Sequence, residues 1–173
     1  MAVTIARESP RQAEIVRLVE ELDEYLENLY PAESNYLLDI EALAQPDIRF
    51  FVARRGGEAL GCVALRVDPA GYGEVKRLYV PPRARGLGLG RRLLAALEEQ
   101  AGRERLTLLR LETGIHQPEA LRLFRAAGFV EIPPFAAYTP DPLSVFMEKA
   151  LHLPLRLGRG RLGSRRHERD EHE

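Results

Sequence analysis

Closely spaced glycines and arginines form the segment of this sequence that is best suited to bind an anion. Arg83 and Arg85 lie just before or within the run that holds Gly86, Gly88 and Gly90. Because glycine has no Cβ atom, backbone N–H groups in such a loop can approach a ligand closely. A helix that begins in the loop adds unpaired N–H groups and the positive end of its dipole. This combination is typical of a site for a phosphate or pyrophosphate.

The residues around the loop predict the elements that position it. Residues 74–80 are apolar and β-branched enough for a buried or half-buried strand. Pro81-Pro82 ends its pairing, since proline has no backbone N–H. The helix after the loop carries apolar residues at helical spacing: Leu93, Leu94, Leu97 and Ala101. A connector that binds no ligand needs one glycine and no arginines, so we favour an anion site.

The spacing of the glycines distinguishes this loop from other phosphate-binding loops. It is not the G-x-G-x-x-G dinucleotide pattern, and no Gly-Lys-Ser/Thr follows as a P-loop requires. Arg85-Gly86-Leu87-Gly88-Leu89-Gly90 resembles the acyl-CoA signature Q/R-x-x-G-x-G/A of the GNAT N-acetyltransferase superfamily. The similarity extends over roughly residues 3–150, including EVKRLYV, LETGIHQPEALRLFRAAGF and IPPFAAYTPDPLSVFMEK. The chain looks like a bacterial subgroup without an assigned substrate.

The predicted order of elements, β-α-α-β-β-β-α-β-α-β-β, is the order of the GNAT fold. The resemblance therefore implies a mixed α/β (α+β) fold, with a central, mostly antiparallel twisted sheet, splayed middle strands and flanking helices. Residues 1–151 are expected to form the acetyltransferase domain. Residues 152–173 are rich in Arg and Glu with little to bury, which predicts a disordered tail.

The first helix has a clear predicted start and one apolar face. Ser9 is expected as its N-cap, with Pro10 at the first helical position and Gln12 closing a capping box. Its buried face is predicted to hold Ile15, Val19, Leu22, Leu26 and Leu29. Residues 30–36 interrupt the helix before a shorter one over 37–43. Ser34 or Asn35 either caps that second helix or helps to line a pocket.

The resemblance implies which residues contact acetyl-CoA as co-substrate. The strand backbone at Leu78, Tyr79 and Val80 would pair with the pantetheine arm. The loop would hold the pyrophosphate through Arg85, Gly86, Leu87, Gly88, Leu89, Gly90 and Arg91. Arg83 and Arg91 are inferred from charge and position alone.

Transfer to an amine requires a base, because an ammonium group has no lone pair. Glu74 begins the motif strand, where the histone-acetyltransferase branch of the superfamily has its glutamate base. The alternation of a strand would place Glu74, Lys76, Leu78 and Val80 on one face, toward the cofactor contacts. The alternative is a glutamate that pairs with an arginine or remains in solvent.

The source of the proton for the leaving thiolate is less clear from the sequence. Many GNAT enzymes carry a tyrosine within an A-x-x-L-Y pattern, where this chain has Phe124, and the usual asparagine is Gln117. Tyr138 or a tyrosine from a different loop supplies the proton, or the thiolate leaves without an acid. Tyr138 could equally be an aromatic plug between prolines.

The acceptor pocket of the family is built from the first helical pair and the late loop. In this chain that implies Tyr30, Glu33, Asn35, Phe135 and Tyr138, and Glu33 could attract a cationic amine. His116 and Glu112 are too few to form a metal site, so a capping or anchoring role is predicted for His116. Cys62 is expected as a small core residue rather than a nucleophile.

Composition sets the limits of these interpretations. The chain has 173 residues, 45% apolar and 29% charged, as expected for one water-soluble domain. A net charge of −1 argues against nucleic-acid binding, and one cysteine excludes a disulfide framework and a cysteine-based zinc cluster. There is no apolar run of about 18 residues and no signal peptide, so a cytoplasmic protein is expected.

The sequence thus predicts an acetyl-CoA-dependent N-acetyltransferase that acts on a primary amine of a small molecule or peptide. No metal, nucleic-acid or membrane partner is expected. The oligomeric state stays open, although a homodimer is common among relatives. One alternative is a non-catalytic CoA-binding regulatory domain, which Phe124 supports. Another is a nucleotide-binding domain that uses GLGLG, and it predicts that ATP or NAD protects the protein as well as CoA does.

Overall fold

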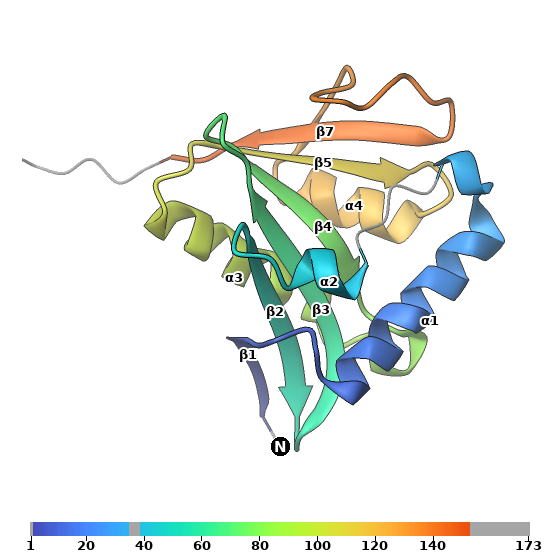
Figure 1. The fold of residues 1–173 in the computed structure, drawn as a ribbon, viewed down its shortest axis with the longest axis vertical. Coiled ribbons are helices and arrows are strands. Elements are labelled where there is room, and N and C mark those ends of the chain that lie inside the picture. Colours follow the sequence, from blue (N-terminus) through green and yellow to red (C-terminus); the bar gives the residue numbers. More distant parts are fainter. Residues whose placement is uncertain (1, 35–38, 153–173) are drawn as a thin grey trace, which may run out of the picture.

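The computed structural model describes residues 2–34 and 39–152 of the chain. Its described part contains one sheet with the strand order β1-β2-β3-β4-β5-β7-β6 (Figure 1). The strands are β1 Val3–Arg7, β2 Ile48–Arg55, β3 Glu58–Val67, β4 Gly73–Tyr79, β5 Leu108–Gly114, β6 Val130–Ile132 and β7 Ser144–Ala150. The helices are α1 Ala13–Leu29, α2 Ile40–Leu43, α3 Leu89–Arg103 and α4 Pro118–Ala126, with short 3₁₀ turns η1 Ala32–Ser34 and η2 Pro82–Ala84.

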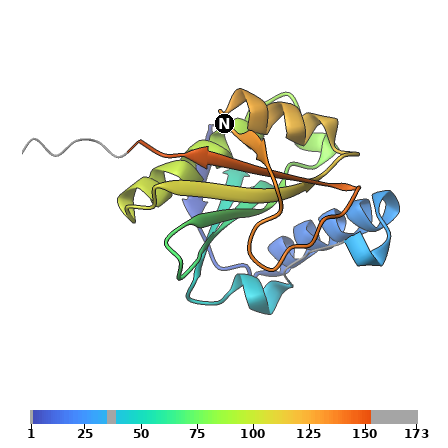
Figure 2. The same cartoon turned by 90° about the horizontal axis from the view of Figure 1, so that it is seen from above.

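Helices cover both faces of the sheet, with α1 and α2 on one side and α3 and α4 on the other (Figure 2). The α3 and α4 side holds the largest core cluster, in which Leu93 and Leu97 pack with strand residues such as Leu109. The α1 side holds a second cluster that joins Ile15 and Val19 to Val52. The mixed α/β architecture with flanking helices is therefore confirmed.

The middle strands of the sheet separate, as predicted. β4 and β5 form the parallel pair of an otherwise antiparallel sheet, and they pair only at Gly73↔Leu109 and Glu74↔Arg110. Beyond these residues the two strands diverge (Figure 1). The facing backbone edges of β4 and β5 then have no strand partner and must find other hydrogen-bonding groups.

A β-bulge in β4 changes which way its side chains point. Tyr79 pairs with Cys62 but Lys76 pairs with Ala64, so the register shifts between these pairs. Arg77 has a φ of 56°, and its carbonyl accepts a hydrogen bond from the Cys62 thiol. Val75 belongs to the α3-side core, and both Leu78 and Val80 pack against the same core. The prediction that Leu78 and Val80 share a face with Glu74 and Lys76 is therefore wrong, because the bulge inserts one residue into the alternation.

The two N-terminal helices begin later than predicted. Gln12 is the N-cap of α1, and Ser9 lies in the preceding turn, where its hydroxyl accepts the N–H of Arg11 at 3.2 Å. For α2, the N-cap is Asp39, whose side chain accepts the N–H of Ala42. Ser34 therefore does not cap α2. Asn35 and the predicted tail beyond residue 152 lie outside the described residues.

Candidate active site

A cleft of about 580 Å³ opens where β4, the glycine loop and the N-terminal end of α4 meet. We call it the glycine-loop cleft. Nearly all of the predicted cofactor residues line it: Leu78, Tyr79, Val80, Arg85, Gly86, Gly88, Leu89, Gly90 and Arg91. Leu87 is not among the lining residues, and its side chain is exposed. The side chain of Leu89 is buried in the core, so only its backbone can face a ligand.

The glycines of the loop have two different structural roles. Gly86 and Gly88 adopt left-handed backbone conformations with φ of 84° and 68°, and a Cβ atom on either would meet nothing within 4 Å. Both therefore leave room beside the first N–H groups of α3, of which Gly88 is the N-cap. Gly90 differs, because a Cβ there would lie 3.1 Å from the side chain of Leu123 on α4. It allows α3 and α4 to pack closely.

The charged groups of the cleft also fit a pyrophosphate. Arg83, Arg85 and Arg91 are exposed around the loop. Arg85 forms an ion pair of 3.5 Å with Glu119 on α4, and Arg83 forms one of 2.9 Å with Glu21 on α1. Exposed ion pairs contribute little stability, so a ligand phosphate can replace these carboxylates at small cost.

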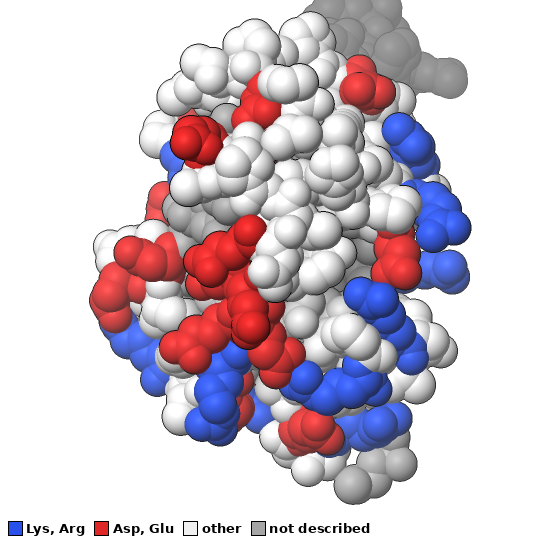
Figure 3. Space-filling model, turned by 90° about the vertical axis from the view of Figure 1, so that its right-hand side faces the viewer, with Lys and Arg blue, Asp and Glu red and all other residues white. Residues whose placement is uncertain are grey.

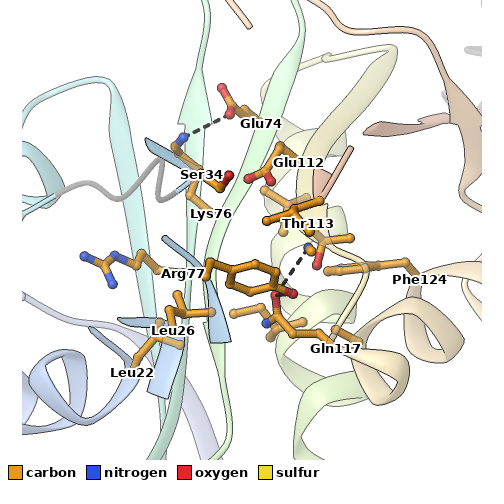
Figure 4. A pocket seen from close by; sticks show the side chains of 16 residues that line it. Leu22, Leu26, Ser34, Glu74, Lys76, Arg77, Glu112, Thr113, Gln117 and Phe124 are labelled. Carbon is orange, nitrogen blue, oxygen red and sulfur yellow. Dashed lines mark hydrogen bonds and ion pairs between the residues drawn. The ribbon is translucent and has the colours of Figure 1, made fainter. Parts of the chain in front are cut away.

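A second cavity, of about 100 Å³, lies in the gap between β4 and β5, and we call it the splay pocket. Figure 4 shows Glu74, Lys76 and Glu112 toward one end and Leu22, Leu26 and Gln117 toward the other. The two cavities have four lining residues in common, namely Leu22, Leu78, Gln117 and Ala120. A thioester that is bound along the glycine-loop cleft would therefore end at the splay pocket.

Glu74 is buried in the splay pocket and bound by several donors. Its Oε1 accepts hydrogen bonds from Tyr138 Oη at 2.6 Å and from Lys76 Nζ at 3.1 Å. Its Oε2 accepts one from Arg66 at 3.3 Å. Glu74 thus lines the splay pocket and is paired with an arginine, the arrangement given above as the alternative to a base.

Tyr138 reaches this network from the late loop. Its hydroxyl donates to Glu74 and accepts from Lys76 Nζ at 2.8 Å. Burial and the nearby Glu74 charge raise the pKa of Tyr138. Its ring also contacts Phe135 and Phe146. Its proton is thus engaged by a carboxylate, which does not favour its use as a general acid.

Glu112 is a second carboxylate of the splay pocket, and sequence reasoning did not identify it as a candidate base. Ser144 Oγ on β7 donates to its Oε1 at 2.9 Å. Burial raises the pKa of Glu112 to about 6, which is close to the value that suits a general base near neutral pH. The alternation of β5 carried the signal, because Leu109 and Leu111 are buried while Arg110 and Glu112 point to the opposite face.

The predicted acceptor residues are only partly brought together. Tyr30 lines the splay pocket, while Glu33 is exposed on η1 and its neighbour Ser34 lines the pocket instead. Phe135 is buried in an aromatic cluster with Tyr72 and Phe146 and does not line the pocket. Asn35 lies outside the described residues.

Three further residues contribute to the pocket and to the core beside it. Phe124 lines the splay pocket with its ring. His116 anchors Tyr30, as its backbone N–H donates to Tyr30 Oη at 3.0 Å and its ring stacks on the tyrosine. Cys62 is fully buried, and burial raises the pKa of its thiol to about 12, which excludes a reactive thiolate at neutral pH.

The described residues were compared with the requirements of membrane-spanning helices and of metal sites. No helix in residues 2–34 and 39–152 is long and apolar enough to cross a membrane. Within the same residues, no group of three or more His, Cys, Asp or Glu side chains is arranged to hold a metal ion.

The face that carries α1 has a cluster of negatively charged side chains. Figure 3 shows acidic side chains gathered in the middle of this face, with basic side chains toward its lower and right-hand edges. The exposed residues of α1 include Glu20, Glu24 and Glu27. Such a surface attracts cations to the side of the molecule on which α1 borders the splay pocket.

Comparison with known proteins identifies the family. Residues 15–129 match the model of the acetyltransferase (GNAT) family. The chain is 57% identical over 150 residues to an IAA acetyltransferase of Azospirillum brasilense, covering 86% of this chain and 98% of the relative. It is 35% identical over 141 residues to the uncharacterized N-acetyltransferase YsnE of Bacillus subtilis, covering 80% and 93% of the two chains.

Solved structures agree with the sequence comparison. A Klebsiella pneumoniae protein described as an acyl-CoA N-acyltransferase superposes with a TM-score of 0.74 at 41% identity, covering 87% of this chain and 98% of the other. PaiA N-acetyltransferase of Thermoplasma acidophilum, in complex with coenzyme A, has the same fold with a TM-score of 0.68 at 19% identity, covering 87% and 100%. The chain therefore belongs to the GNAT acetyltransferase family of acyl-CoA-dependent N-acyltransferases.

Proposed function

We propose that this enzyme transfers the acetyl group of acetyl-CoA to a primary amine of a small molecule or peptide. The observation that carries the proposal is the meeting of the glycine-loop cleft and the splay pocket at Leu22, Leu78, Gln117 and Ala120. A cofactor held in the first cavity presents its thioester to an acceptor in the second. Two buried or half-buried carboxylates, Glu74 and Glu112, lie on the acceptor side of this meeting point.

The chain's own groups hold acetyl-CoA in this proposal. The N–H groups at the start of α3 and the space beside Gly86 and Gly88 receive the pyrophosphate. The backbone edge over residues 78–80, at the end of β4, is left unpaired by β5 and receives the pantetheine amides. Binding along a preformed edge orients the thioester carbonyl for attack without a large loss of chain entropy.

We propose Glu112 as the base that takes the proton of the attacking amine. One of its oxygens accepts from Ser144, and its raised pKa of about 6 matches the task. Glu74 is the alternative base. Its carboxylate oxygens accept hydrogen bonds from Tyr138, Lys76 and Arg66, so an incoming amine would have to displace one of these donors. Glu74 then serves to hold Lys76 at the pocket wall and to anchor Tyr138 of the late loop.

The charge of the surface supports an amine as the acceptor, and the size of the splay pocket supports acetyl as the transferred group. The acidic face of α1 favours the approach of a cationic molecule, and a protonated amine is such a molecule. For the transferred group, the relative from Azospirillum brasilense that is 57% identical over 150 residues is named an IAA acetyltransferase, which supports transfer of an acetyl group. The splay pocket of about 100 Å³ suits an acetyl group and a small attacking group rather than a long acyl chain.

Thermal unfolding with and without acetyl-CoA tests the location of the cofactor. Ligand at about 100 times its dissociation constant adds roughly 2.7 kcal/mol of apparent stability. Gly88→Glu should abolish this gain, because its carboxylate occupies the cleft and repels phosphate. Gly71→Glu is the matched control, since Gly71 also has a left-handed φ, of 93°, with nothing within 4 Å of an added Cβ. The control should keep the gain.

Release of free CoA thiol in the presence of amines separates the catalytic proposal from the non-catalytic alternative. That alternative, which Phe124 supports, predicts a full thermal shift with acetyl-CoA but no thiol release with any amine. A shift from ATP or NAD that equals the shift from CoA would instead favour a general nucleotide-binding domain. Glu112→Gln and Glu74→Gln then show which carboxylate is the base. A cytoplasmic location and a homodimer stay predictions for fractionation and light scattering.

A further inference from the structure

Departure of CoA places an electron pair on its sulfur, and a nearby hydrogen-bond donor would stabilise that charge. Phe124 lines the splay pocket but carries no polar hydrogen. Tyr138 lines neither cavity, and its hydroxyl donates to the carboxylate of Glu74. A donor to this sulfur must therefore come from another group near the meeting point of the two cavities.

Tyr30, the C-cap of α1, lines the splay pocket and places its hydroxyl next to a residue of this meeting point, Gln117. Gln117 lines both cavities, and Tyr30 Oη donates to its Oε1 at 3.3 Å. The same Oε1 accepts the N–H of Gly114, at 3.3 Å, so the amide group is fixed from two sides. The hydroxyl therefore lies one hydrogen bond from a residue that borders the bound thioester.

The position of this hydroxyl is set by the packing around it. A Cβ atom on Gly114 would lie only 1.8 Å from Tyr30 Oη, so the absence of a side chain on β5 makes room for the phenol. The backbone N–H of His116 donates to Tyr30 Oη at 3.0 Å, and the two rings stack with centroids 5.5 Å apart. Tyr30 itself is only 7% exposed. Such a held donor loses little entropy when it meets a developing charge.

We propose that the Tyr30 hydroxyl is the proton donor to the sulfur of the departing CoA. This inference rests on the acetyl transfer proposed above and assigns it one more catalytic residue. Tyr30, at the end of α1, thus donates the proton that Phe124 on α4 cannot donate.

The step balances in protons and electrons. The acceptor first loses its ammonium proton to water. The neutral amine nitrogen then forms the new C–N bond, and its surplus proton passes to Glu112. The C–S bond then breaks with its electron pair on sulfur, and sulfur takes the phenolic proton of Tyr30. The phenolate regains a proton from water in the pocket, and Glu112 returns its proton to water. Burial raises the pKa of Tyr30, so the phenol stays protonated before each turnover at neutral pH.

Steady-state kinetics of Tyr30→Phe give the first test. The proposal expects kcat to fall by roughly 100-fold, the lower range for loss of an acid or base. The KM for acetyl-CoA and the thermal shift with CoA should stay unchanged. Tyr72→Phe is the matched control, because Tyr72 is also 7% exposed, its hydroxyl also makes a side-chain hydrogen bond, to Asp68, and it lines neither cavity. A kcat of Tyr30→Phe within about twofold of wild type would overturn the proposal.

A second-site variant separates chemistry from packing. Phe124→Tyr adds a hydroxyl to another side chain that lines the same pocket. Combined with Tyr30→Phe it should restore part of the lost kcat, although it cannot restore the hydrogen bonds to His116 and Gln117. Loss of kcat without recovery, in a double variant that still binds CoA, points to a packing role and contradicts proton donation.

Titration of CoA bound to the enzyme gives a readout that needs no acceptor. Ultraviolet absorbance follows the thiolate of bound CoA as pH rises. A Tyr30 hydrogen bond to the thiolate lowers the pKa of the CoA thiol. Tyr30→Phe should therefore raise the pKa of that thiol by about one pH unit or more. An unchanged titration overturns the proposal. If wild type transfers no acetyl group to any amine but this difference is present, only the proposed acceptor reaction fails and the contact stands.

Discussion

At the scale of single residues, the splay pocket shows how environment assigns different tasks to two glutamates. Glu74 accepts hydrogen bonds from Tyr138, Lys76 and Arg66, whereas Glu112 accepts one from Ser144 among the described residues. Several donors hold the carboxylate of Glu74 in place, whereas burial raises the pKa of Glu112. The two carboxylates of one pocket are therefore suited to different roles, positioning for Glu74 and proton transfer for Glu112.

Glu112→Gln should lower kcat/KM by roughly 100-fold or more at neutral pH, because the amide cannot take the proton. In wild type, kcat/KM should rise with pH through about 6, where the Glu112 carboxyl ionises. The residual kcat/KM of Glu112→Gln should not show this rise with pH. If Glu74→Gln removes the rise and Glu112→Gln keeps it, Glu74 is the base.

The same carboxyl should make stability depend on pH. Its pKa is about 6 in the folded protein against 4.5 for an exposed glutamate, so the fold binds this proton more tightly than the unfolded chain does. Its contribution is therefore present at pH below 4.5 and lost as pH rises to about 6, by about 2 kcal/mol. Denaturant unfolding of wild type and Glu112→Gln across this range measures the difference. Parallel curves would contradict the raised pKa.

At the scale of elements, the cofactor site depends on how α4 approaches the glycine loop. Gly90 allows the approach because a Cβ would press on Leu123, and it brings Glu119 of α4 within 3.5 Å of Arg85. A carboxylate so close to the phosphate site competes for the arginine that a phosphate needs. The close packing of α3 and α4 thus carries an electrostatic cost for cofactor binding.

Glu119→Gln should therefore tighten acetyl-CoA binding several-fold, because it removes both the competition for Arg85 and the repulsion of phosphate. Glu99→Gln is a suitable control, since Glu99 forms a comparable exposed pair with Arg103 on α3 away from the cleft. Titration calorimetry at low and high salt measures both variants, and the gain should shrink as salt rises. Equal affinities of wild type and Glu119→Gln at low salt would show that Arg85 does not contact the cofactor.

The elements also show what local sequence can reveal. The strand, the glycine loop and α3 follow from the proline, glycine and leucine spacing over residues 74–101, because these signals act over a few residues. The bulge at Arg77 does not, since a period of two cannot reveal an inserted residue. Tyr30 and Glu112 meet in one pocket only through the packing of α1 against the splayed strands, which no local pattern encodes. The acceptor side was therefore predicted less completely than the cofactor side.

At the scale of the whole molecule, the described residues contain the sheet, both helical layers and both cavities. A chain that ends at residue 152 should therefore keep the kcat and the acetyl-CoA affinity of the full chain within about twofold. Its melting temperature should shift by no more than a few degrees, because the core clusters are unchanged. Parallel turnover and unfolding measurements check this. A large loss of turnover would give residues 153–173 a part in the site.

The four residues common to the two cavities have a consequence for the order of events in turnover. Donor and acceptor can occupy their cavities at the same time and touch at Leu22, Leu78, Gln117 and Ala120. The described wall of the splay pocket includes no cysteine, and Cys62 is sealed in the core. The acetyl group therefore has no cysteine thiol with which to form a covalent acetyl-enzyme intermediate. Initial rates should obey a sequential, ternary-complex law with intersecting double-reciprocal lines rather than the parallel lines of a ping-pong enzyme.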